Sequence, residues 1–433
     1  MGILIYRPTP VLIPKDCACR RDFLSRHSTA DNTLLTETDY REYDSRTLFY
    51  DVLRCDDDRK VVAIGPPPVN LRNEMAKLRV TCDGQLIPHR KREYRKLCVL
   101  ELTFDQTTNT GKNLPLRFSF PSFHVEIEVP PPPCLPPAET YRLGLMTLQR
   151  NNPLPWIQDW CRWHHRLHGM SRLVLYDNAS DNRDDLVAAL TRMDEEIDVV
   201  LVDWPFPHGP VRSHKNRLCQ PGAQNHYLLR FGSADAWCLN LDIDECLVVS
   251  GEKTFREYLH DCESNGVVEV LFDSFIVPPY QGQPAMANRR INSYWFRNRE
   301  RRGSSLKFAF KPRYIDYLKL HIAYPKNRVF AKLTGLPRLY DEAHQSLYGS
   351  VRKRLCSERM FRLFFPKQHA LRDLSPEEMF FYHFRGLNTN WKRDFSEKVE
   401  SFDASRHVSD PLINELFARA GLNPGPRPPA AGT

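Results

Sequence analysis

The stretch Trp237-Cys238-Leu239-Asn240-Leu241-Asp242-Ile243-Asp244-Glu245-Cys246-Leu247 is the most informative part of the chain. Its apolar run ends abruptly in three carboxylates, and Gly and Ser residues flank it on both sides. A run this short with such flanks predicts a buried strand whose acidic end emerges at a sheet edge. Because side chains two apart on a strand point the same way, Asp242 and Asp244 should share a face while Ile243 is buried on the other.

Two carboxylates this close repel each other unless a cation neutralises them. Hard oxygen ligands suit Mg²⁺ or Mn²⁺, which takes its other ligands from substrate phosphates and water. The motif therefore indicates a metal-bridged nucleotide diphosphate, with Asp242 and Asp244 as candidate metal ligands. For an isolated Asp-x-Asp, the alternative is a solvated strand end.

A second strand ends in a polar turn at Leu175-Tyr176-Asp177-Asn178-Ala179-Ser180-Asp181, and a helix is predicted to begin near Asn182. In open α/β sheets, ligands bind outside the carboxyl ends of strands, where an acidic residue accepts hydrogen bonds from a nucleotide. We therefore expect Asp177 and Asn178 to bind the nucleobase or ribose in one crevice with the acidic motif.

The order of these motifs resembles the GT-A glycosyltransferases of glycosyltransferase family 92 and the related family-2-like enzymes. The resemblance covers roughly residues 141 to 395. The residues that carry it are Leu148-Gln149-Arg150-Asn151-Asn152, then Trp160, His164 and Gly169, then Leu175 to Asp181, Asn225, and Leu241-Asp242-Ile243-Asp244-Glu245.

This resemblance implies a Rossmann-like nucleotide-sugar domain, a divalent Mn²⁺ or Mg²⁺ held by the Asp-x-Asp motif, and sugar transfer with inversion. The expected donor is a nucleotide sugar, specifically a UDP-sugar, and the expected acceptor is a glycan or glycolipid. The donor-binding candidates in this part of the chain are Arg150, Asn151, Asp177, Asn178, Asn225 and Asp242.

A late cluster, Phe380-Phe381-Tyr382-His383-Phe384-Arg385-Gly386, interrupts an aromatic run with two polar side chains. Many GT-A enzymes take their last metal ligand from a late histidine, so His383 is the candidate, with Arg385 and Lys392 on the diphosphate. The alternative is a core histidine hydrogen-bonded to backbone.

The mechanism that follows has the metal act as a Lewis acid on the departing diphosphate, while a carboxylate takes the acceptor proton. The sequence leaves the base open among Asp273, Glu269, Glu300 and Asp316. Two alternatives stand beside the transferase. One is a metal-dependent phosphodiesterase using Asp242, Asp244 and His383, and the other is a non-catalytic glycan-binding protein.

Prolines at 130–133, 136 and 137 predict a stiff extended linker over residues 130–138. Before it, alternating segments and an Asp83-Gly84 turn predict a β-rich, β-sandwich-like module over residues 1–129, with 1–40 unassigned. Its role is either carbohydrate binding or a structural cap. After the linker we expect a GT-A α/β domain over 139–400, then a C-terminal helix and disordered tail over 401–433.

Composition supplies two further expectations. A net charge of +8 favours anionic partners, and no nucleic-acid-binding motif is present, so nucleic acid is not expected. The 12 cysteines lack metal-type pairing, and neither a leader nor an 18-residue apolar run is found. These features predict a cytoplasmic protein that reaches a membrane-anchored acceptor peripherally.

Overall fold

The computed structural model describes residues 3–15, 42–55, 57, 59–108, 111–133, 142–193, 197–210, 217–265, 267–279, 290–300, 302–325, 371–374, 377–386 and 403–423. Three predicted features lie outside this set. They are Lys392, the second part of the predicted linker (residues 134–138), and the predicted tail after residue 423.

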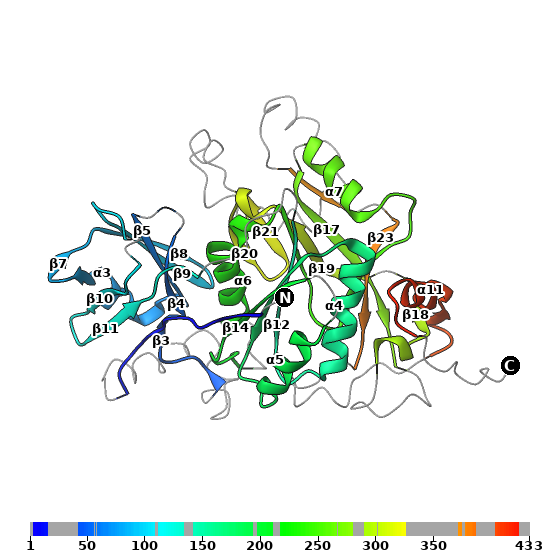
Figure 1. Cartoon of the computed structure of the whole chain (residues 1–433), viewed down its shortest axis with the longest axis horizontal. Coiled ribbons are helices and arrows are strands. Elements are labelled where there is room, and N and C mark those ends of the chain that lie inside the picture. The colour runs from blue at the N-terminus through cyan, green and yellow to red at the C-terminus, as the bar shows by residue number, and fades with distance from the viewer. Residues whose placement is uncertain are drawn as a thin grey trace.

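A ten-stranded mixed sheet forms the larger part of the molecule, and its strands have the order β1-β14-β13-β12-β15-β19-β17-β23-β16, with β22 beside β17 (Figure 1). The first five strands in this order, from β1 to β15, run parallel to one another, whereas β19 is antiparallel to both β15 and β17. The mixed α/β architecture confirms the predicted fold class at this level. The bounds are β1 Ile3–Tyr6, β12 Leu143–Gln149, β13 Arg172–Asp177, β14 Asp198–Asp203, β15 Trp237–Asn240, β16 Glu245–Val249, β17 Val267–Val277, β19 Arg302–Phe310, β22 Leu371–Leu374 and β23 Met379–Phe384.

Helices cover both faces of this sheet because successive strand residues are buried on opposite sides. Leu175 of β13 belongs to the cluster that includes α4 and α5, whereas Tyr176 belongs to the cluster that includes α6. The tryptophans Trp156, Trp160 and Trp163 lie on one helix, α4, which ends at His168 with Gly169 as its C-cap at φ 69°. The helix bounds are α4 Leu154–His168, α5 Arg183–Thr191, α6 Cys219–Arg230, α7 Phe255–Ser264 and α11 Pro411–Arg419.

Two four-stranded antiparallel sheets precede the large sheet, with orders β4-β5-β9-β8 and β11-β10-β6-β7. Val61 of the first and Phe118 of the second lie in one buried cluster. Asp83 and Gly84 both have positive φ, so the predicted hairpin turn is confirmed. That these sheets form a separate β-sandwich-like domain stays a prediction. The bounds are β4 Asp51–Arg54, β5 Lys60–Gly65, β6 Arg79–Cys82, β7 Gln85–Leu86, β8 His89–Tyr94, β9 Leu97–Thr103, β10 Leu114–Ser119 and β11 His124–Val129, with α3 Arg72–Ala76 and the pair β2 Val11–Leu12 and β3 Thr47–Phe49 beside them.

The start of the chain differs from the predicted 1–129 module. β1 pairs in parallel with β14, so Ile3–Tyr6 is an edge strand of the large sheet. A short apolar run such as Ile3-Leu4-Ile5 could form a strand of the large sheet or of a smaller one. Its parallel pairing with β14 assigns it to the large sheet. The N-terminal segment therefore crosses from the large sheet into the smaller ones.

The segment after residue 402 contains the predicted C-terminal helix, α11, and this helix is part of the large-sheet core. Ile413, Leu416 and Phe417 are buried in the same cluster as α4. β24 His407–Ser409 pairs with β18 Phe296–Asn298, and β20 Ile315–Lys319 with β21 Ile322–Pro325. Among the described residues, no helix is both long and apolar enough to cross a membrane.

Candidate active site

The Asp-x-Asp motif lies in a turn, and the prediction that it continues the strand is wrong. β15 ends at Asn240, and β16 begins at Glu245. The reason is local: the Glu245 backbone N–H donates to the Asp242 carbonyl (3.0 Å), and the Asp242 N–H donates to Glu245 Oε2 (2.9 Å). Ile243 is buried, as predicted. The turn is therefore closed by Glu245.

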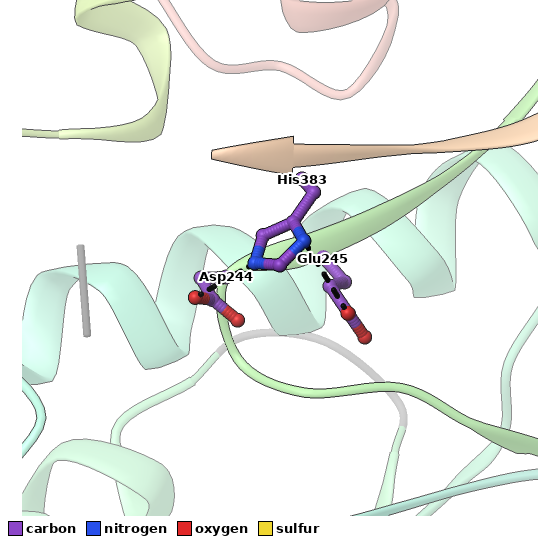
Figure 2. A group of neighbouring side chains, drawn as sticks. All are labelled: Asp244, Glu245 and His383. Atoms are coloured by element: carbon purple, nitrogen blue, oxygen red, sulfur yellow. Dashed lines mark ion pairs between the residues drawn. The ribbon is translucent and has the colours of Figure 1, made fainter. Parts of the chain in front are cut away.

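Asp244, Glu245 and His383 form a compact cluster, with one ligand atom of each within 4.8 Å of the others (Figure 2). His383 Nε2 lies 3.4 Å from Asp244 Oδ2, and its Nδ1 lies 3.8 Å from Glu245 Oε1. The antiparallel pairing of β16 with β23 brings these residues together, because Glu245 and His383 are direct partners in its register. The Phe384 N–H also donates to the Asp244 carbonyl at 2.8 Å.

The electrostatics of the cluster favour an ionised Asp244. Burial alone would raise the pKa of Asp244, but His383, Lys307 and Arg385 outweigh it and hold the pKa below its ordinary value. Burial raises the pKa of Glu245, and Lys307 opposes that rise. The two adjacent carboxyl groups thus have different proton affinities.

Lys307 of β19 is a site residue that the sequence reasoning missed. Its Nζ lies 2.7 Å from Asp242 Oδ2 and 2.9 Å from Glu245 Oε2. Burial would lower the pKa of Lys307, but Asp242 and Glu245 raise it above its ordinary value. The signal in the sequence was a single lysine within the apolar run Leu306 to Phe310.

The donor set of the cluster suits a small divalent cation. Two carboxylates and one imidazole match Mn²⁺, which takes both oxygen and nitrogen ligands, and also allow Mg²⁺ with water completing its shell. Asp242 lies outside this set: Gln220 Nε2 donates to its Oδ1 at 3.3 Å, and Lys307 occupies its Oδ2. The metal-ligand role of Asp242 stays a prediction.

The predicted base-binding and ribose-binding side chains lie at the carboxyl end of β13, where they also stabilise the turn. Asp177 Oδ1 accepts from Ser180 Oγ at 2.5 Å, and burial raises the pKa of Asp177. Asn178 Nδ2 donates to the carbonyls of Trp204 and Phe206, both at 2.7 Å. Their contact with a donor stays a prediction.

The other donor-binding candidates differ in their burial and in their hydrogen bonds to the rest of the protein. Asn225 is buried and bonds to Leu318 through both its Nδ2 (2.8 Å) and its Oδ1 (2.7 Å), which joins α6 to β20. Asn151 holds Asp181 through Nδ2 at 2.9 Å. Arg150 is exposed, and Arg385 is half-buried.

The base candidates separate clearly. Asp273 lies half-buried at the irregularity between Phe272 and Ser274 of β17, and within the described residues its side chain has no hydrogen bond or ion pair. Glu269 is buried and accepts from the Ala323 N–H at 2.6 Å. Glu300 is exposed. Asp316 is half-buried, and its Oδ1 lies 3.0 Å from Arg92 Nη1.

Basic side chains lie near His208, which is also close enough to Asp242 for that carboxylate to influence its pKa. Burial and the charges of Arg217 and Arg150 lower the pKa of His208 to about 4, while Asp242 opposes that shift. Burial, Arg95 and Arg217 lower the pKa of Lys96 to about 8, and Lys96 Nζ donates to the Arg217 carbonyl at 3.3 Å. Such surroundings suit an anionic ligand.

Comparisons with solved structures find several weak likenesses. The bifunctional glycosyltransferase WbbM is 13% identical with a TM-score of 0.25, and the match covers 36% of this chain and 26% of WbbM. TarS from S. aureus is 11% identical with a TM-score of 0.22, over 40% of this chain and 47% of that one. HddC from Yersinia pseudotuberculosis is 9% identical with a TM-score of 0.28, over 56% and 92%. Likenesses of this strength carry no argument.

The matched part spans only about a quarter (26%) of the WbbM chain and under half (47%) of the TarS chain. A comparison with curated proteins finds no match. The model of glycosyltransferase family 92 matches residues 157–417, which is more than half of the chain and includes the acidic turn, Lys307 and His383. The chain belongs to glycosyltransferase family 92.

Proposed function

We propose that this protein is a metal-dependent glycosyltransferase that moves a sugar from a nucleotide-diphosphate donor to a hydroxyl of a glycan acceptor. Family membership supports glycosyl transfer. The observation that carries the metal and donor proposal is the cluster of Asp244, Glu245 and His383, with the positive charges of Lys307 and Arg385 acting on Asp244. Mn²⁺ or Mg²⁺ would be held by these three residues and would act as a Lewis acid on the diphosphate.

The chain's own residues would place the donor around this cluster. Asp242 is the most exposed carboxylate of the turn, with a side chain 36% exposed, and is suited to accept hydrogen bonds from the donor ribose. Arg385, whose charge already acts on Asp244, would pair with the diphosphate. A UDP-sugar is the expected donor, and a glycan or glycolipid, reached peripherally if it is membrane-anchored, is the expected acceptor.

Asp273 is our candidate for the catalytic base because its half-buried carboxylate has no partner within the described residues. It would take the proton from the acceptor hydroxyl as that oxygen forms a bond to the anomeric carbon. The bond between that carbon and the diphosphate oxygen breaks at the same time, and the anomeric centre is inverted.

Calorimetry with nucleoside diphosphates tests the donor proposal. We expect UDP to bind in the presence of Mn²⁺ and to bind at least about 10-fold more weakly once Asp244 is changed to Asn, the loss typical of a disrupted metal site. Glu252→Gln is the matched control because Glu252 is exposed on the loop after β16. Equal UDP affinity with and without Mn²⁺ would contradict the proposal.

A further inference from the structure

Lys307 is a buried cation in direct contact with the acidic turn. Its side chain is 4% exposed, and its ammonium lies between Asp242 Oδ2 (2.7 Å) and Glu245 Oε2 (2.9 Å). Burying an ammonium among carboxylates carries a desolvation cost that only close pairing offsets. Such a residue restricts where its two carboxylate partners can lie.

The sheet fixes the position of Lys307 rigidly. β19 lies between β15 and β17, where Lys307 is the register partner of Phe272 and its neighbour Phe308 is the partner of Asn240. Central strands hold side chains more precisely than loops do. The acidic turn after β15 is therefore anchored by a charge on a neighbouring strand.

The contacts divide the oxygens of the three carboxylates into two groups, and Glu245 contributes one oxygen to each. Lys307 and Gln220 engage the two oxygens of Asp242, and Lys307 also engages Oε2 of Glu245. Oε1 of Glu245 and Oδ2 of Asp244 instead face His383. Three carboxylates and one ammonium leave two negative charges, which one divalent cation would balance.

We propose that Lys307 is a positioning residue that keeps Asp242 away from the metal and sets the charge of the acidic turn. One divalent cation would then bind at Asp244, Glu245 Oε1 and His383, which leaves Asp242 for the donor. The inference rests on the proposed function, since it requires that this cluster bind a divalent cation. No substrate contact by Lys307 itself is involved.

Titration of the full chain with Mn²⁺ alone, by calorimetry and by electron paramagnetic resonance, tests this role. We expect Asp242→Asn, which removes a charge but no metal ligand, to lower Mn²⁺ affinity clearly less than Asp244→Asn, which lowers it by at least about 10-fold. Lys307→Met should bind Mn²⁺ about 10-fold more tightly, with a changed resonance spectrum, because the freed Asp242 adds a charge and a ligand. The double variant Asp242→Asn with Lys307→Met should return to within about 3-fold of the unaltered affinity.

A purely structural lysine gives a different pattern. In that case Lys307→Met weakens Mn²⁺ binding and the double variant does not restore it, which overturns the proposal, as does Asp242→Asn proving as harmful as Asp244→Asn. If Lys307→Met does not fold, the Asp242→Asn and double variants decide the question. Failure of the unaltered chain to bind Mn²⁺ overturns the proposed metal site together with this inference. The other outcomes differ from this one because in them the unaltered chain binds Mn²⁺ and only the variants depart from expectation.

Discussion

Glu245 and His383 face each other across the antiparallel pair β16–β23, although they lie far apart in the chain. The pairing brings His383 Nδ1 within 3.8 Å of Glu245 Oε1 and His383 Nε2 within 3.4 Å of Asp244 Oδ2. His383 thus approaches two carboxylates through its two ring nitrogens. A core histidine bonded only to backbone would have no such arrangement.

His383→Ala should raise the Mn²⁺ concentration needed for half-maximal transfer by about 10-fold or more, because one of three candidate metal ligands is lost. The melting temperature measured without metal should change little. His165→Ala is a useful control, since His165 lies on α4 and its Nδ1 bonds to the Met170 carbonyl at 2.7 Å. A lower melting temperature with an unchanged Mn²⁺ requirement would assign His383 to the core instead.

Asp177→Ala should weaken donor binding more than it harms folding, because the carboxylate lies at the end of β13, where a ribose or base would be held. Ser180→Ala is the matched control, since it removes the 2.5 Å hydrogen bond from Ser180 Oγ to Asp177 but keeps the charge. Calorimetry with UDP and Mn²⁺ measures both. Equal donor affinity in the two variants would exclude Asp177 from the donor site.

Elements with strong local patterns could be predicted from sequence. The apolar run before Asp177 locates β13, and the polar turn after it locates the start of α5 near Asn182, because both signals lie within a few residues. The acidic turn could not be predicted as a turn, because it depends on a hydrogen bond from the Asp242 N–H to the Glu245 carboxylate. The apolar pattern before it gives no sign of that bond and instead favours a continued strand. Lys307 was missed because its contact with Asp242 depends on which strand pairs with β15.

The smaller sheets and the large sheet meet at a buried hydrogen-bonded pair, Asp51 of β4 and His226 of α6, with Nε2 and Oδ2 2.8 Å apart. Tyr6 of β1 also donates to Asp51 at 2.6 Å. Removing one partner of a buried hydrogen bond leaves the other partner unsatisfied and costs about 1 to 3 kcal/mol. Asp51→Ala should therefore destabilise the large-sheet part as well, even though Asp51 itself lies in a small sheet.

Tryptophan fluorescence during urea unfolding measures this coupling, because all 7 tryptophans follow the proline-rich segment. Asp316→Asn is the control, since its pair with Arg92 also joins the two parts but is partly exposed and should cost no more than about 1 kcal/mol. Limited proteolysis should still cut near residues 130 to 138. An unchanged fluorescence midpoint in Asp51→Ala would show that the two parts unfold independently.

Stability should fall as the pH drops below about 6.5 because of buried His164. Its Nδ1 donates to the Trp160 carbonyl and its Nε2 accepts from the Leu247 N–H, so burial and these bonds exclude a second proton. Burial and His168 lower the pKa of His164 to about 3. The unfolded chain binds a proton near pH 6.5 and the folded chain does not, so stability is complete above that pH and is lost progressively below it.

Between pH 7 and pH 5 this residue alone should remove about 2 kcal/mol from the free energy of unfolding. His164→Gln should flatten that part of the pH profile, whereas His260→Gln, at a side chain 76% exposed, should not. Urea unfolding at the two pH values gives the comparison. A parallel profile in His164→Gln would contradict the assignment.

The products formed from a panel of nucleotide sugars, with Mn²⁺ and with or without glycan acceptors, test the central claim most directly. We predict release of nucleoside diphosphate that requires both Mn²⁺ and an acceptor, and that falls at least about 10²-fold in Asp244→Asn, as when one preorganised electrostatic contact to a developing anion is lost. Release of nucleoside monophosphate would indicate a phosphodiesterase instead. Nucleoside diphosphate release that persists in full in Asp244→Asn under chelator, or no turnover of any donor, would contradict a metal-dependent glycosyltransferase.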